Sequence, residues 1–98
     1  MDVNGLNSLT TVTGYLEITL NSELQSIDGF SSLNIISNYL SIGQNPALVN
    51  LNGFSSLNET VGYLTILSNG MLNDISGLSS LQNIGSYITV FFSLSINP

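Results

Sequence analysis

The most informative feature of this 98-residue sequence is what it lacks, since it contains no Lys, Arg, His, Cys or Trp. Without basic residues the chain cannot neutralise phosphates, which argues against nucleic-acid binding and against attraction to an anionic membrane surface. Without cysteine it has no disulfide, no thiolate chemistry and no Cys-type zinc site. The net charge of −6 comes from six carboxylates: Asp2, Glu17, Glu23, Asp28, Glu59 and Asp74.

The missing residue types also exclude most forms of catalysis. Nucleophilic triads need His, Schiff-base chemistry needs Lys, and clamping of transferred phosphates needs Arg. A pair of carboxylates remains conceivable, but Glu17 and Glu23, which are close in sequence, fall on different parts of the repeat described below. Calcium prefers carboxylate and carbonyl oxygens, yet no repeat position holds carboxylates in two neighbouring copies. We therefore predict no catalytic residue, no cofactor and no metal site.

Long apolar segments are absent as well. The longest apolar runs span two or three residues, as at Val90-Phe91-Phe92, so we expect no segment that inserts into a bilayer. The N-terminus shows neither the positively charged nor the apolar region of a signal peptide. Hydrophobic residues nevertheless make up 43% of the chain, which is not typical of a disordered protein. The sequence therefore predicts one small folded domain with a buried core.

What the sequence does contain is a 24-residue repeat that runs through the whole chain without insertion or deletion. Its copies cover about 3–26, 27–50, 51–74 and 75–98. A period of this size is typical of leucine-rich-repeat and β-helix solenoids, in which each copy is one coil. We predict that residues 1–98 form four stacked coils. The clearest columns are Gly5, Gly29, Gly53 and Gly77; Leu9, Leu33, Leu57 and Leu81; and Tyr15, Tyr39, Tyr63 and Tyr87.

The repeat contains one segment with the period of a strand. Residues 15–20 alternate apolar and polar side chains, and the equivalent segments, which start at Tyr39, Tyr63 and Tyr87, should pair with it in one parallel sheet. Elsewhere apolar residues recur at every third position from Leu24 to Ile36, but the Gly, Ser and Asn between them are poor helix formers. We therefore predict an all-β solenoid with parallel sheets, short strands, tight corners and little or no helix.

Two details of the repeat carry further expectations. The glycine column should supply a corner in which φ is positive or no side chain fits. In the third copy an apolar residue stands at Val61 where the period calls for position 60, which predicts a small local shift.

A polar column accompanies the apolar ones. An asparagine amide both donates and accepts hydrogen bonds, so it can satisfy backbone groups at a buried corner and bond to its copy one coil along. We interpret this column as a structural ladder rather than a ligand site; it consists of Asn21, Asn45, Asn69 and Ser93.

The pattern Gly-[Leu/Phe]-x-x-Leu followed by Tyr-Leu-x-Ile-x-x-Asn-Pro-x-Leu is clearest from Gly29 to Leu48. It resembles the receptor L-domain family of leucine-rich repeats, especially the tandem forms on bacterial and microbial cell-surface proteins, and all four copies match. The resemblance implies a right-handed β-helix-like solenoid with about three short strands per coil. It also implies an extracellular or cell-surface location and a role in ligand recognition or adhesion. The Asn-Pro pair is in register only at Asn45-Pro46 and lies four residues late at Asn97-Pro98.

Two outward columns of the predicted sheet form the candidate binding face, and a third column runs beside them. Tyrosines suit binding surfaces because they combine an apolar body with a polar tip, but stacked aromatic residues also stabilise a sheet without binding anything. A third column, Thr19, Gly43, Leu67 and Phe91, becomes apolar toward the C-terminus. The candidate residues are Tyr15, Tyr39, Tyr63 and Tyr87 with Glu17, Ser41, Thr65 and Thr89.

These features predict a non-catalytic repeat module of a secreted or cell-surface protein that recognises a protein or a surface glycan. The alternatives are a structural spacer in a surface stalk and an ice- or polysaccharide-binding solenoid. Asn58-Glu59-Thr60 matches the acceptor pattern for a glycan in a eukaryotic secretory pathway, although so short a pattern also arises by chance. The copies at both ends carry no polar cap, so we expect a fragment of a longer array that either self-associates through its ends or is marginally stable.

Overall fold

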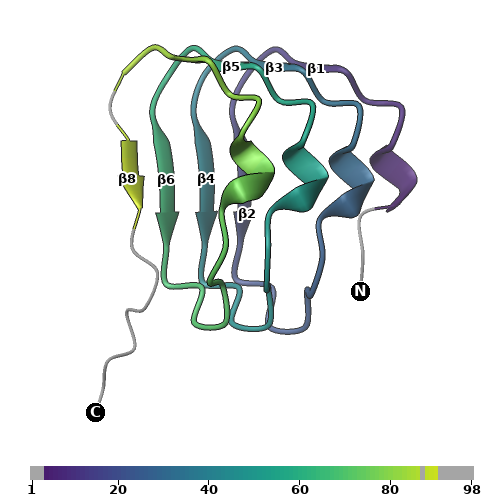
Figure 1. The fold of residues 1–98 in the computed structure, drawn as a ribbon, viewed down its shortest axis with the longest axis vertical. Coiled ribbons are helices and arrows are strands. Elements are labelled where there is room, and N and C mark those ends of the chain that lie inside the picture. The colour runs from purple at the N-terminus through teal and green to yellow at the C-terminus, as the bar shows by residue number, and fades with distance from the viewer. Residues whose placement is uncertain (1–3, 87, 91–98) are drawn as a thin grey trace.

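The computed structural model describes residues 4–86 and 88–90 (Figure 1). Within them the chain forms two four-stranded parallel sheets and no α-helix. The all-β class with parallel sheets is therefore confirmed. Of the predicted positions, Tyr87, Phe91, Ser93 and the Asn97-Pro98 pair lie outside the described residues.

Each 24-residue copy contributes one short strand to each sheet. The first sheet has the order β1-β3-β5-β7 and two-residue strands: Thr11–Val12, Ile35–Ile36, Glu59–Thr60 and Asn83–Ile84. The second has the order β2-β4-β6-β8: Leu16–Thr19, Leu40–Gly43, Leu64–Leu67 and Ile88–Val90. Every strand pairs with its equivalent in the next copy, as Leu16 with Leu40 and Leu40 with Leu64. The two strands of one copy therefore never pair with each other.

A 3₁₀ turn stands where the resemblance implied a third strand. These turns are η1 to η4: Asn4–Leu6, Asp28–Phe30, Asn52–Phe54 and Ser76–Leu78. The backbone N–H of Phe30 donates to the carbonyl of Ile27 at 3.1 Å, and that of Leu33 to Phe30 at 3.0 Å. Side chains three residues apart share one side of a 3₁₀ turn, so the apolar residues at every third position all face the core. The expectation of about three strands per coil is wrong for the described copies.

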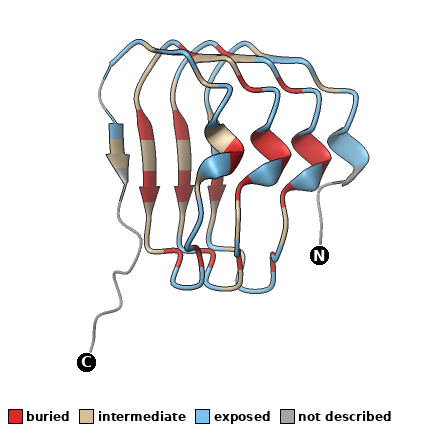
Figure 2. Ribbon diagram, in the orientation of Figure 1, coloured by how far each residue is buried: buried red, intermediate tan, exposed pale blue. Residues whose placement is uncertain are grey.

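The core is a set of stacked apolar columns between the sheets and the 3₁₀ turns. Figure 2 shows buried residues on the middle strands, where they alternate with half-buried ones, and on the middle 3₁₀ turns. Leu40, Ile42, Leu64 and Ile66 on the second sheet are 0% exposed. Phe30 and Phe54 stack across neighbouring turns with ring centroids 5.4 Å apart. Identical side chains therefore pack against their own copies, which explains why these columns keep their size.

The glycine column provides close approach and not a left-handed backbone. No described glycine has a positive φ. A Cβ atom on Gly53 would overlap the carbonyl oxygen of Ile27, and one on Gly77 that of Leu51. The left-handed positions lie instead directly after β2, β4 and β6, at Leu20 (φ 61°), Gln44 (φ 56°) and Ser68 (φ 62°).

The local shift expected in the third copy is also absent. Glu59 and Thr60 pair in register with Ile35 and Ile36. Thr60 is buried in the core column, while Val61 points outward with 49% of its surface exposed. Register therefore takes precedence over side-chain polarity here: sliding β5 by one residue would bury Val61 but would break the pairing with both neighbouring strands.

Candidate functional site

The outer face of the second sheet carries most of the predicted binding residues. Inward from this sheet lie buried isoleucines such as Ile18, Ile42 and Ile66. Because successive side chains of a strand point to opposite sides, Ser41 and Thr65 point outward and are half-buried. Figure 1 shows the four strands at one side of the molecule and the 3₁₀ turns toward the other. We call "the outer face" the described outward residues Glu17, Ser41, Thr65 and Thr89 with the neighbouring Tyr15, Tyr39 and Tyr63.

The tyrosines form a stack directly before the strands. The rings of Tyr15 and Tyr39 have centroids 4.6 Å apart and planes inclined by 4°. Tyr39 and Tyr63 repeat this arrangement at 4.6 Å and 2°. Both faces of the Tyr39 ring are therefore covered by its neighbours, and it presents only its edge and its hydroxyl group. A sugar ring or a cation cannot stack on it, because such contacts need a free aromatic face.

The Tyr39 hydroxyl is held by the one carboxylate of the outer face. It donates a hydrogen bond to Oε2 of Glu17 at 3.0 Å. Desolvation, followed by this hydrogen bond and by the negative charge of Glu17, raises the pKa of Tyr39 to about 12. The hydroxyl therefore stays protonated, and remains a hydrogen-bond donor, at every physiological pH.

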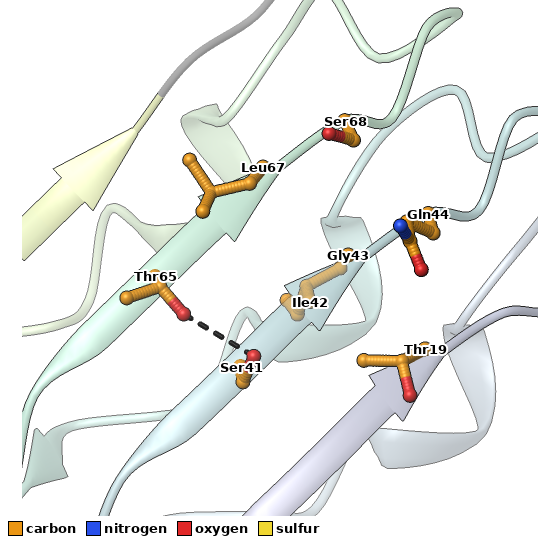
Figure 3. Close-up of a pocket in the computed structure, with 8 residues that line it drawn as sticks. All are labelled: Thr19, Ser41, Ile42, Gly43, Gln44, Thr65, Leu67 and Ser68. Carbon is orange, nitrogen blue, oxygen red and sulfur yellow. Dashed lines mark hydrogen bonds between the residues drawn. The ribbon is translucent and has the colours of Figure 1, made fainter.

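A shallow depression lies at the C-terminal end of the strands of the second sheet, where Gly43 has no side chain to fill the space (Figure 3). Its volume is about 200 Å³. Beside it, the Thr65 hydroxyl donates to the Ser41 hydroxyl at 3.2 Å. The side chains of Thr19, Gln44 and Ser68 make no hydrogen bond to another described residue. It is lined by five residues with polar side chains and by Gly43, Ile42 and Leu67; the five are Thr19, Ser41, Gln44, Thr65 and Ser68.

Gly43 differs from the glycines that the fold requires. A Cβ atom there would lie 3.3 Å from the Leu67 carbonyl oxygen and 3.9 Å from Thr19 Cγ2, so a small side chain would fit with slight adjustment. Glycine inside a strand weakens it and often marks close approach of a ligand or another backbone. The depression was not predicted from the sequence. The signal was there, as a glycine in the outward column between Thr19 and Leu67.

The asparagine column lies behind this depression, at the corner that follows the second sheet. Asn45 Nδ2 donates to the Ile18 carbonyl at 2.8 Å and to Asn69 Oδ1 at 3.1 Å. Asn69 Nδ2 donates in the same way to the Ile42 carbonyl at 3.0 Å. Asn21 Nδ2 reaches Asn45 Oδ1 at 2.9 Å. Asn45 and Asn69 are 0% exposed and Asn21 is half-buried, so the described part of the column ties neighbouring copies together.

The described carboxylates do not form a cluster. No group of three or more Asp or Glu residues in the described part of the chain could hold a metal ion. Asp74 accepts a 2.8 Å hydrogen bond from the Ser76 backbone N–H, and this bond, with one from the Ser76 side chain, lowers the pKa of Asp74. Asp74 therefore stabilises the start of η4. Across the described residues there is also no helix long and apolar enough to cross a membrane.

Asn58 lies apart from the outer face, directly before β5 of the first sheet, and is half-buried. Its backbone N–H donates to the Asn34 carbonyl at 2.8 Å. Its own carbonyl accepts from Gln82 at 2.9 Å.

No protein-family model, no curated protein and no solved structure matches the chain. The function must therefore be inferred from the geometry of the chain itself.

Proposed function

We propose that this chain is a non-catalytic solenoid module of the leucine-rich-repeat type, resembling receptor L domains, in a secreted or cell-surface protein. Its function is to recognise another protein, or to adhere to one, through the outer face. Support for the solenoid comes from the strand register, in which each residue pairs with the residue 24 positions later. Support for the absence of catalysis comes from the residue types that the sequence lacks.

The observation that carries the proposal is the combination of an edge-on tyrosine stack with a row of small hydroxyl groups on one parallel sheet. Tyrosine edges and hydroxyls provide apolar contact and hydrogen bonds at a small entropic cost. The side chains in this row are small enough to let a partner approach; they belong to Ser41, Thr65 and Thr89. Glu17 is the only charged residue of the outer face. The depression at Gly43 can receive one protruding side chain of the partner.

The same geometry favours a protein over a glycan as the partner. A glycan surface commonly needs an aromatic face on which a sugar ring lies, and both faces of Tyr39 are covered by Tyr15 and Tyr63. The Thr65 hydroxyl is already donated to Ser41, which reduces the number of free donors along the row.

A charge placed on the outer face tests the proposal. Thr65→Arg puts a bulky cation in the middle of β6, and Ser56→Arg adds the same charge at an exposed position next to η3. Both variants and the unmodified chain would be applied to arrays of purified extracellular proteins and of glycans, after thermal melts show that they fold. We expect protein targets that lose binding at least tenfold with Thr65→Arg and keep it with Ser56→Arg.

Two outcomes would contradict the proposal. Targets that bind Thr65→Arg and Ser56→Arg equally well would place recognition elsewhere on the molecule. A chain that binds nothing on either array would instead support a structural spacer.

A further inference from the structure

Among the described residues, Thr60 is the one buried polar side chain that the fold does not explain. It is 0% exposed, and its Oγ1 is the only buried side-chain nitrogen or oxygen among the described residues without a hydrogen-bond partner. The equivalent positions in the other copies hold Val12, Ile36 and Ile84. Burying a hydroxyl group without a partner is unfavourable. Valine has the same branched shape without the hydroxyl group, so nothing in the packing of β5 calls for threonine.

The Thr60 hydroxyl completes a sequence motif, although the packing of the fold does not require it. Asn58-Glu59-Thr60 is the only Asn-x-Ser/Thr tripeptide in the chain. This pattern is the acceptor for N-linked glycans, and it needs a hydroxyl two residues after the asparagine. The unexplained hydroxyl of Thr60 stands at that position.

The surroundings of Asn58 are compatible with an attached glycan. Its position in the repeat is occupied elsewhere by Thr10, Asn34 and Gln82, which are all exposed. The bonds that fix Asn58 use its backbone: its N–H donates to Asn34, and its carbonyl accepts from Gln82 and Asn83. The Asn58 side chain makes no hydrogen bond to another described residue. A glycan on its amide nitrogen therefore displaces no interaction of the described chain.

We propose that Asn58 is an N-glycosylation site that is modified before the chain folds. The co-reactant is a lipid-pyrophosphate-linked oligosaccharide of the secretory membrane, brought to the chain by its transferase. The Asn58 amide nitrogen attacks the anomeric carbon of the first sugar, and a carbon–nitrogen bond forms. The bond from that carbon to the pyrophosphate oxygen breaks, the lipid pyrophosphate leaves with the electron pair, and the amide nitrogen gives one proton to the medium.

The order of events follows from the position of Thr60. A transferase that reads the hydroxyl needs access to it, and in the folded chain it is fully buried. Glu59 and Thr60 are also paired on both sides, with β3 and with β7. The acceptor is therefore open only in the unfolded chain, and folding closes it with the glycan left outside.

This site does not depend on the outer face. Asn58 precedes β5 of the first sheet, whereas the outer face belongs to the second sheet, and Figure 1 shows the two sheets on different sides of the molecule. A glycan at Asn58 thus leaves the outer face free for a protein partner.

Translation of the full chain behind a cleavable signal peptide, with microsomes of the secretory pathway, tests the proposal. We expect a mass increase that an endoglycosidase removes. It should disappear with Asn58→Gln and with Thr60→Val, and should persist with Thr60→Ser. An unmodified mass for the original chain would overturn the proposal, as would a glycan that survives Thr60→Val.

Two further measurements test the argument from burial. Solubilised transferase with lipid-linked donor should modify the urea-unfolded full chain and leave the folded chain unmodified; equal modification of both would overturn the order of events. Thr60→Val, produced without a glycan, should melt at a higher temperature than the original chain. A lower melting temperature would show that the hydroxyl serves the fold, and the argument from Thr60 would fail.

Discussion

Asn45 uses all the hydrogen-bonding capacity of its side chain. Its Oδ1 accepts from the backbone N–H and from the Nδ2 of Asn21, at 3.2 and 2.9 Å. Its Nδ2 donates to the Ile18 carbonyl and to Asn69 Oδ1. Because the residue is 0% exposed, no water can replace these bonds if the side chain is removed.

We therefore expect Asn45→Ala to lower the free energy of unfolding by roughly 2–4 kcal/mol, since it leaves several buried groups without partners. Asn21→Ala is the matched control. Asn21 is half-buried and its side chain donates one hydrogen bond, to Asn45 Oδ1, so its loss should cost about 1 kcal/mol. Urea denaturation measures both. Equal losses at the two positions would contradict the ladder as a buried network.

Tyr39 should ionise only at high pH. Its pKa is raised from 10.0 to about 12, first by desolvation and then by the hydrogen bond and charge of Glu17. A pKa that is higher in the folded state contributes stability that is fully present below pH 10 and is lost as the pH rises toward 12. In a phenolate absorbance titration, Tyr39→Phe should remove the ionisation step near pH 12. Glu17→Gln should bring that step to lower pH, and an unchanged step would contradict the contact.

Individual residues differ in how far their place in the structure could be predicted from the sequence. The asparagine ladder could be predicted, because an amide can both donate to and accept from its own copy at a buried corner. The buried position of Thr60 could not, because polarity favoured Val61 for the core, and register with Ile36 and Ile84 decided otherwise. The depression at Gly43 depends on side chains from three neighbouring strands, which no single copy of the repeat displays.

At the scale of elements, a left-handed residue stands in the described corners after β2, β4 and β6. Leu20, Gln44 and Ser68 have φ values of 61°, 56° and 62°. They share no side-chain chemistry, and none is glycine, so this conformation could not be predicted from the residue types. A left-handed backbone costs about 1–2 kcal/mol for a residue with a Cβ atom, and the bonds of the neighbouring asparagine ladder hold the corner in place.

Leu20→Gly should therefore stabilise the fold. Leu20 is 74% exposed, so little packing is lost, and relief of the left-handed strain should raise the free energy of unfolding by about 0.5–1 kcal/mol. The control is Gln25→Gly, an exposed position in the same corner that is not left-handed, where glycine should destabilise by a similar amount. Thermal melts of both variants measure these changes in stability. A loss of stability with Leu20→Gly would contradict a strained corner.

The 3₁₀ turns show a different limit of the sequence. Apolar residues at every third position are the pattern of a 3₁₀ turn, and this pattern is present from Leu24 to Ile36. The residues between these apolar positions are mostly glycine, serine and asparagine, which predicted tight corners and not an α-helix. They did not distinguish a short strand from a 3₁₀ turn. The hydrogen bonds from Phe30 to Ile27 and from Leu33 to Phe30 settle the matter.

At the scale of the whole molecule, one relation organises the described structure: each strand residue pairs with the residue 24 positions later. This relation places identical side chains next to one another, which explains the apolar columns, the tyrosine stack and the asparagine ladder together. It also generates the outer face, because residues that are far apart in the sequence become neighbours on one sheet. The repeat period made this arrangement predictable, while the shape of the corners depended on the backbone.

Cysteine pairs test this relation most directly, and the chain has no cysteine of its own to interfere. Ser41 and Thr65 are register partners whose hydroxyl oxygens lie 3.2 Å apart. Strand neighbours are separated by about 4.8 Å, within the Cα range of a disulfide. Ser41→Cys with Thr65→Cys should form an intramolecular disulfide under mild oxidation. Ser41→Cys with Thr89→Cys, two strands apart, should not, and a disulfide that forms as readily in this second pair would contradict the stacked register.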